Sequence, residues 1–357
     1  MAFTLVLGLA ALFQLVAVLM ALRLNTIYRR RYAWLFISGA GILMALWIGA
    51  GIVDTIQHPP GNITWEPTLW VQTLATLLTA ILFFAGISTI EPLFKENEAA
   101  RALLASENAL LNREVQHSRE EMMLAQRVQS NLLPKSAPAV RGLDIAFLSR
   151  PAEWTSGDYF DFVEPDDNTL IVTVADVCGH GIGPALLMTT SRSYFRGIAK
   201  TRKQCQPILN TWNNAIAEDV EDGDFMTALV VRLDLKERQI EYLGAGQNGL
   251  LIHDDGTFEE LERSGPPLGI INNFDYPCPD CIPLRSGQIL VLCTDGIHET
   301  EGKDGSQFGT HRIADLLSMH RELTATQMVK RLDIEVRNFA AAPKAHDDLT
   351  AVIIKIA

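Results

Sequence analysis

Aspartates in four short motifs hold most of the chemical information in this sequence. The motifs are Ser156–Asp161, Val174–Gly181, Cys293–Gly296 and Asp347–Thr350. Three of them adjoin runs of aliphatic or β-branched residues, so we expect the ends of buried strands to deliver their acids. Carboxylates brought together without a cation would repel and raise one another's pKa. The pattern therefore predicts a metal site, and its oxygen ligands suit Mg²⁺ or Mn²⁺ rather than zinc.

The order of these motifs resembles that of a known family. From Ala125–Pro134 to Asp347–Thr350, the sequence is similar to the bacterial SpoIIE-type branch of the metal-dependent (PPM) serine/threonine protein phosphatases. A single motif such as Thr-Asp-Gly recurs by chance, whereas several in this order do not. The resemblance covers about residues 125–357. It implies two Mn²⁺ or Mg²⁺ ions that activate water, with no covalent nucleophile.

The resemblance also implies a role for each matching residue. Asp176 matches the ligand that bridges the two ions, and Val177 matches the position that supplies a backbone carbonyl. Asp295 and Asp347 match the ligands that complete the second ion's site. Asp158 matches an acid that contacts metal directly or through water. The alternative for each aspartate is a capping or turn residue, and we expect these four to form the catalytic and metal-binding set.

Other residues near the motifs have less definite roles. Asp161 and Asp348 are expected to support the site rather than bind metal. His180 is either the general acid or a structural histidine, and the second reading is favoured. Arg150 either clamps the substrate phosphate or forms a surface ion pair, and the ion pair is favoured. Gln247 departs from the family, which often has His at its position.

The front of the chain is unusually apolar. Residues 1–22, 33–53 and 69–90 contain no charged residue, and each run approaches the roughly 20 residues that a bilayer-crossing helix needs. We therefore expect three transmembrane helices in a membrane region at residues 1–90. Arg23 and Arg29–Arg31 crowd the first connection, whereas residues 54–68 contain no Lys or Arg. The positive-inside rule then predicts an inner-membrane protein with its N-terminus outside and its catalytic domain in the cytoplasm.

Charge and cysteine content exclude some functions. The formal net charge of -12 disfavours nucleic acid as a partner, because binding a phosphate backbone needs a basic face. The five cysteines all follow residue 90 and do not form a disulfide framework in a reducing cytoplasm. Cys278 and Cys281 have the spacing of half a zinc site or a redox pair, but no second Cys/His pair accompanies them. We interpret them as part of an incidental loop.

Residues 91–133 are expected to form a helical connector. Residues 93–133 contain neither Gly nor Pro and are rich in helix-forming residues. One favoured interpretation is a parallel homodimeric coiled coil, in which Asn108 would set the register. The alternative is a single amphipathic helix that packs on its own catalytic domain. The expected seam consists of Leu104, Asn108, Leu111, Val115, Ser118, Met122 and Ala125.

Residues 134–357 are expected to form the phosphatase domain. Strand-like runs near 144–149, 159–163 and 169–175 precede helices near 184–200 and 207–219. Further strands are expected near 225–233, 239–243, 249–253, 288–293 and 349–356, with helices near 310–320 and 324–340. Turns at 234–238 and 254–257 favour antiparallel pairing. Grouped strands and helices indicate an α+β fold, and the family resemblance implies an α-β-β-α sandwich of two antiparallel sheets.

Together these features predict a membrane-anchored phosphoserine/phosphothreonine protein phosphatase of bacterial signalling. Family members commonly act on STAS-domain anti-sigma antagonists in partner-switching pathways, so such a protein is the expected partner. One alternative is a signalling scaffold that keeps the fold without turnover. A cyclic-dinucleotide synthase is a weaker alternative, because Ser156–Phe160 only superficially matches a Gly-Gly-Asp-Glu-Phe loop and lacks its glutamate.

Overall fold

A computed structural model describes residues 2–28, 31–57, 67–220, 223–342 and 347–357. Arg29, Arg30 and residues 58–66, on which the predicted membrane orientation partly rested, lie outside the described residues. The chain divides into two compact units, Met1–Val115 and Gln116–Ala357. Each unit is described by itself.

The first unit consists of helices. They are α1 (Ala2–Tyr28), α2 (Arg31–Gln57) and the first part of α3 (Pro67–Leu132). Helices α1 and α2 approach closely at Gly41, where an added Cβ would meet the Val18 side chain and lie 3.2 Å from Gln14 Nε2. Gln14 is buried and donates a hydrogen bond to the Gly41 carbonyl at 3.2 Å. The small residue is therefore needed for packing within the chain.

The prediction of membrane spans requires correction. Across the described ranges, no helix is long and apolar enough to cross a membrane. The prediction had used the absence of charge over about 20 residues, which is a weaker criterion than sustained apolarity over that length. Helices are present over 1–22, 33–53 and 69–90, within α1, α2 and α3, but their assignment as transmembrane helices, and the multi-pass inner-membrane location with it, is not supported by the structure.

Helix α3 joins two segments that the sequence analysis had separated. It runs from Pro67 to Leu132 and contains Pro92, so residues on both sides of the predicted boundary at 90 belong to one helix. The boundary between the two compact units instead follows Val115. The division into regions 1–90, 91–133 and 134–357 stays a prediction.

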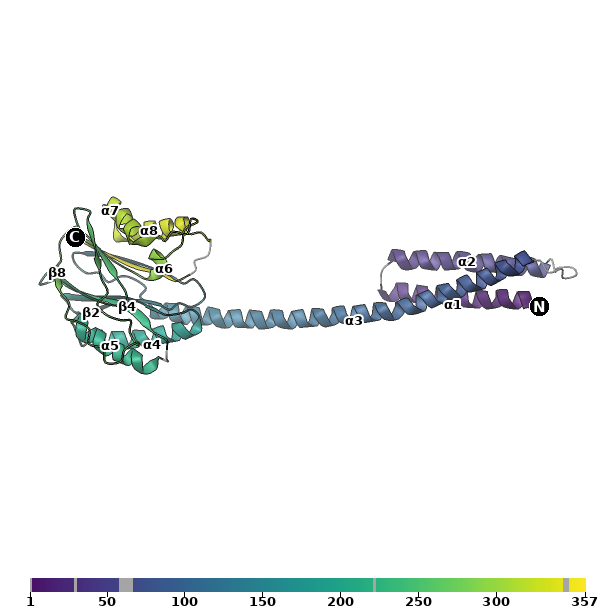
Figure 1. Ribbon diagram of the computed structural model, residues 1–357, viewed down its shortest axis with the longest axis horizontal. Coiled ribbons are helices and arrows are strands. Elements are labelled where there is room, and N and C mark those ends of the chain that lie inside the picture. The colour runs from purple at the N-terminus through teal and green to yellow at the C-terminus, as the bar shows by residue number, and fades with distance from the viewer. Residues whose placement is uncertain (1, 29–30, 58–66, 221–222, 343–346) are drawn as a thin grey trace. The chain divides into compact units, whose positions relative to one another are not determined.

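The second unit contains two five-stranded antiparallel sheets (Figure 1). The first sheet has the order β1-β10-β9-β6-β7, and the second has the order β2-β3-β4-β5-β8. The strands of the first sheet are β1 (Leu143–Arg150), β10 (Leu349–Ile356), β9 (Ile289–Cys293), β6 (Gly249–Ile252) and β7 (Phe258–Leu261). Those of the second are β2 (Asp158–Asp166), β3 (Thr169–Val177), β4 (Met226–Asp234), β5 (Gln239–Ala245) and β8 (Cys281–Pro283).

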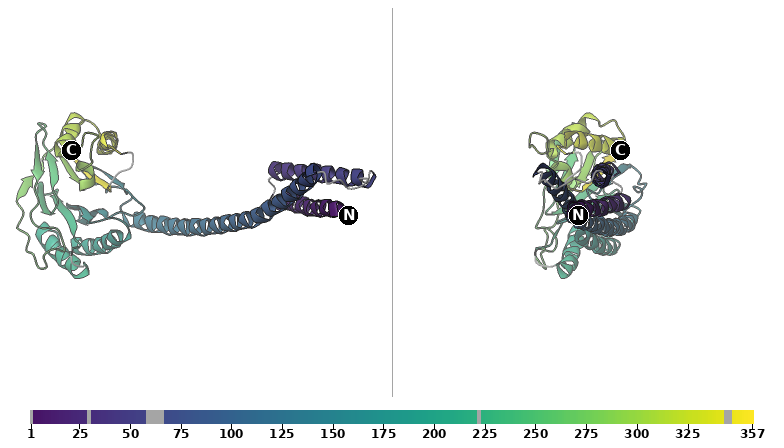
Figure 2. Two further views of the ribbon diagram at one scale, coloured as in Figure 1. Left: turned by 45° about the vertical axis from the view of Figure 1, so that its right-hand side comes forward. Right: turned by 90° about the vertical axis from the view of Figure 1, so that its right-hand side faces the viewer.

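Helices cover the outer face of each sheet (Figures 1 and 2). Helices α4 (Ile182–Ala199) and α5 (Cys205–Asp219) pack on the second sheet. Helices α7 (Gly309–Met319) and α8 (Ala325–Phe339) pack on the first. Phe160, Val172, Leu290 and Val352 belong to a third apolar cluster, which lies between the two sheets. The predicted α+β sandwich of two antiparallel sheets is confirmed.

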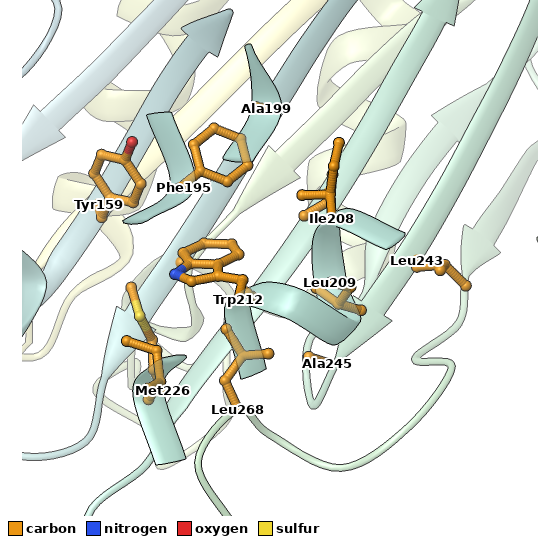
Figure 3. Close-up of a cluster of buried hydrophobic side chains, with 14 of the residues drawn as sticks. Tyr159, Phe195, Ala199, Ile208, Leu209, Trp212, Met226, Leu243, Ala245 and Leu268 are labelled. Atoms are coloured by element: carbon orange, nitrogen blue, oxygen red, sulfur yellow. The ribbon is translucent and has the colours of Figure 1, made fainter. Parts of the chain in front are cut away.

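The core beneath α4 and α5 centres on Trp212, which is fully buried (Figure 3). Its ring lies 4.8 Å from that of Phe195, and its indole N–H donates to Ser191 Oγ at 2.9 Å. The Ser191 hydroxyl in turn contacts Met226 Sδ, on the first residue of β4. The cluster also contains residues of β2 and β3, so it packs both helices against the strands that carry Asp158 and Asp176.

Candidate active site

A cross-strand pair of acids forms one side of the candidate site. Asp158 begins β2 and is the direct antiparallel partner of Asp176 on β3, so the two side chains leave the same face of the sheet. Thr294 Oγ1 donates to Asp158 Oδ2 at 2.9 Å. A Cβ on Gly157 would lie 2.8 Å from the Val177 carbonyl oxygen and 3.1 Å from Asp176 Oδ1. Glycine is therefore required for this close approach.

The other acids come from the first sheet. Asp295 begins the short helix α6 (Asp295–His298) directly after β9. Asp347 lies two residues before β10, and β9 and β10 are antiparallel neighbours. The Thr294 N–H donates to the Thr350 carbonyl at 3.0 Å, which ties the two approaches together. Asp295 and Asp347 therefore meet at one end of the sandwich, facing the pair on the second sheet.

The pKa values show that these acids form one electrostatic group. Burial raises the pKa of Asp158 well above its usual value of 3.8, and the charge of Asp176 raises it further. Burial, together with the charges of Asp295 and Asp347, raises the pKa of Asp176 to about 8. The pKa of Asp347 is also raised, first by burial and then by Asp295 and Asp348. The ionised form of each of these carboxyl groups is thus disfavoured by burial and by its acidic neighbours.

The donor set fits a divalent cation. No three His, Cys, Asp or Glu side chains of the described residues already stand in a metal-binding arrangement. Hard carboxylate oxygens of this kind are the ligands that Mg²⁺ and Mn²⁺ prefer. The residues present are thus chemically suited to such ions.

A pH dependence of stability follows from the raised pKa of Asp176. Because the folded value of about 8 exceeds the ordinary value of 3.8, the native state binds more protons between them. The contribution of the Asp176 carboxyl group to stability is fully present below pH 3.8 and is lost as the pH rises towards 8. We expect the thermal midpoint of the metal-free protein to fall between pH 5 and pH 8. If Asp176 is the cause, the thermal midpoint of Asp176→Asn should depend less on pH than that of the wild type. An equal dependence of the midpoint on pH in both proteins would contradict this prediction.

Asp348 has a structural role beside the site, as predicted. It is buried, and its two carboxylate oxygens accept hydrogen bonds from the Ala152 N–H at 2.7 Å and the Gly157 N–H at 3.0 Å. It therefore holds the loop that leads to Asp158. Asp161 instead accepts two contacts from Arg196 Nη1, at 2.6 and 2.7 Å, and supports helix α4.

Other residues from the sequence analysis lie around this centre. The His180 side chain is 85% exposed and lies 3.8 Å from Glu153 Oε2. Gln247 is buried, accepts from Thr227 Oγ1 at 3.3 Å and donates to the Cys293 carbonyl at 2.9 Å, so it ties β4 to β9. Cys278 and Cys281 are exposed free thiols.

Gln129 contacts the site although no role was predicted for it. This buried residue near the end of α3 donates from Nε2 to the Ser156 carbonyl at 2.7 Å. Its Oε1 accepts from the Ser156 N–H at 3.0 Å. The Gln129 side-chain amide thus bonds both the N–H and the carbonyl of Ser156, as the backbone of a neighbouring strand would. Ser156 Oγ then accepts from the Asp158 N–H at 3.0 Å, which links the helix to an acid of the site.

Gln129→Ala should therefore impair the site without removing any acid. We expect a roughly tenfold loss of metal affinity or activity, which is the usual cost of losing a residue that orients ligands. Titrating activity against Mn²⁺ concentration measures the change. Ser130→Ala removes an exposed hydroxyl that contacts only its own helix backbone, at Arg127, and serves as the matched control. If the activity of both variants and of the wild type depended equally on Mn²⁺ concentration, Gln129 would have no role in positioning the site.

Comparison with known proteins identifies the family. Residues 166–357, more than half of the chain, match the family model described as Stage II sporulation protein E (SpoIIE). The chain belongs to the SpoIIE family. Phosphoserine phosphatase RsbU of Bacillus subtilis strain 168 is 29% identical over 245 residues, which cover 67% of this chain and 71% of RsbU. Phosphoserine phosphatase RsbP of the same strain is 22% identical over 247 residues, covering 67% of this chain and 59% of RsbP.

Solved structures confirm the fold of this SpoIIE-family chain. The SiaA-PP2C domain of Pseudomonas aeruginosa superposes with a TM-score of 0.62 at 22% identity, over 68% of this chain and 98% of that domain. The family membership and the named phosphatase relatives make the chain a protein serine/threonine phosphatase. Because it spans 71% of RsbU and only 59% of RsbP, its substrate and partners are matters for proposal.

Proposed function

We propose that this SpoIIE-family chain removes phosphate from phosphoserine or phosphothreonine of a STAS-domain anti-sigma antagonist in a partner-switching pathway. The observation that carries the proposal is the convergence of acids from both sheets, with Asp158 and Asp176 directly paired across β2 and β3. The similarity to RsbU, named a phosphoserine phosphatase, supports the substrate class.

In this proposal Asp158, Asp176, Asp295 and Asp347, with the Val177 carbonyl, hold two Mn²⁺ or Mg²⁺ ions. When bound, such ions lower the pKa of water and neutralise charge on the phosphate. The chain's own residues position this centre. Asp348 and Gln129 hold the loop before Asp158 through hydrogen bonds to the backbone of Gly157 and Ser156, respectively.

The full chain should hydrolyse a phosphoserine peptide and a small aryl phosphate when Mn²⁺ or Mg²⁺ is present. Chelation should stop hydrolysis, and restoring the metal should recover it. A phosphorylated STAS-domain protein should be a better substrate than a peptide without its fold. A folded chain that binds metal but turns over none of these would support the alternative, a catalytically silent scaffold.

We also propose that α3 forms a homodimer through the seam predicted for residues 91–133. Leu104, Leu111 and Val115 are 57%, 52% and 48% exposed in the single chain, which leaves apolar surface for a second helix. Light scattering should give twice the 39.5 kDa chain mass. A monomer at micromolar concentration would contradict the dimer.

A further inference from the structure

A second charged group lies beside the acids of the site. Asp333 on α8 is 9% exposed, and its Oδ2 accepts from Arg150 Nη2 at 3.1 Å and forms an ion pair with Arg337 Nη2 at 3.0 Å. Arg150 ends β1, and its partner in the register is Leu349, two residues after Asp347. Two guanidinium groups thus share a single carboxylate oxygen at the edge of the candidate site.

Neither arginine is saturated by this pairing, although Arg337 and Asp333 also form an i,i+4 ion pair within α8. A strong Arg–carboxylate pair is bidentate and occupies both oxygens. Here the other oxygen, Asp333 Oδ1, is buried without a hydrogen-bond partner among the described residues. The side chains of Arg150 and Arg337 stay 43% and 53% exposed. Each guanidinium has five N–H donors, so most of them remain for a ligand, and the group carries one net positive charge.

Both arginines line a cavity of about 760 Å³ that also reaches Asp347 and Gly296. Such a volume is typical of a ligand site and exceeds what one phosphoseryl side chain fills. The cavity has acidic residues as well, Glu299 and Glu301, which follow α6. Its positive side is therefore confined to the wall made by the end of β1 and by α8.

We propose that Arg150 and Arg337 form a specificity subsite for an acidic side chain of the phosphoprotein, close to its phosphoserine. The subsite rests on the proposed phosphatase function. In the proposed function, the ions held by Asp176 and Asp347 would bind the reacting phosphate, and the cavity continues from Asp347 to the arginines. An Asp or Glu near the phosphoserine meets guanidinium donors there. Arg337 is a specificity residue in this proposal, held by its contacts with the Asp333 side chain and, through Nε at 3.2 Å, the Asp333 carbonyl.

The test compares three substrates on the full chain with Mn²⁺. They are a phosphoserine peptide flanked by Glu, the same peptide with Gln in place of Glu, and a small aryl phosphate. The wild type should show a KM about tenfold lower for the Glu peptide, as expected for one hydrogen bond between charged groups. Arg337→Gln should raise that KM to the value for the Gln peptide. Its kcat and its aryl phosphate turnover should match those of the wild type.

Two further variants make the result specific. Arg331→Gln removes another α8 arginine, paired at 2.9 Å with Glu335, and should retain the preference for the Glu peptide. Arg337→Glu should favour a peptide flanked by Lys, which a merely structural role would not produce. Equal KM values of the wild type for the Glu and Gln peptides would overturn the subsite while leaving the phosphatase function intact.

The remaining outcomes also separate the possibilities. A matching loss of aryl phosphate hydrolysis in a folded Arg337→Gln would show that the arginine holds the reacting phosphate, which overturns the subsite. If the wild type hydrolyses none of the three substrates, the proposed function fails and the subsite fails with it.

Discussion

Asp176→Asn should abolish metal-dependent phosphatase activity of the chain. Asp176 is the residue that its neighbours Asp158, Asp295 and Asp347 all influence electrostatically. Replacing it removes a charged oxygen donor from the centre of the group. Loss of a residue that merely orients a metal ligand lowers metal affinity or activity by about ten- to a hundredfold. Because Asp176 is itself a proposed ligand, we expect the activity of Asp176→Asn to fall by more than about a hundredfold. Steady-state hydrolysis of a phosphoserine peptide with Mn²⁺ measures it, and Asp295→Asn should behave in the same way.

The same variant should be more stable than the wild type without metal. Asn carries no charge, so it removes the cost of burying a carboxylate and the repulsion from Asp295 and Asp347, which together raise the pKa of Asp176 to about 8. Thermal unfolding at pH 8 should give a higher midpoint for the metal-free variant, with little further gain on adding Mn²⁺. Asp167→Asn, at an exposed position in the turn between β2 and β3, is the control. An Asp176→Asn protein with wild-type turnover would contradict the proposed metal site.

Gly296→Ala should disrupt both stability and activity. Gly296 is buried in α6 between Asp295 and the approach to β10. A Cβ there would collide with the Asp348 carbonyl oxygen and lie 3.4 Å from Asp347 Cβ. Because the obstacle is backbone, the segment that carries Asp347 must move. We expect a loss of about 1–3 kcal/mol in the free energy of unfolding, measured by urea denaturation, and a roughly tenfold or greater loss of activity.

The matched control is Gly197→Ala in α4, where an added Cβ meets nothing within 4 Å. Alanine is favoured over glycine inside a helix by up to about 1 kcal/mol. This variant should therefore be at least as stable as the wild type and equally active. A Gly296→Ala protein that resembles it in both measurements would show that the loop around Asp348 adapts freely.

The elements of the catalytic domain could largely be predicted from local pattern. The strand expected near 169–175 is β3 (Thr169–Val177), and the helix expected near 324–340 is α8 (Ala325–Phe339). The short strands β7 and β8 were missed, because strands of four and three residues carry too little periodic signal. The absence of charge led to an error at the front of the chain, where uncharged runs were interpreted as membrane spans.

The sequence by itself determined the family to which the chain belongs and predicted a set of acids for a metal site, because the order of short motifs is a property of the linear chain. Only the tertiary structure decided which distant residues meet. Gln129 and Ser156 are separated by 27 residues, and Arg150 and Asp333 by 183. The first contact depends on where the end of α3 packs, and the second on how α8 lies against β1. Such contacts follow from long-range packing and sheet register, and no local pattern of residue types encodes them.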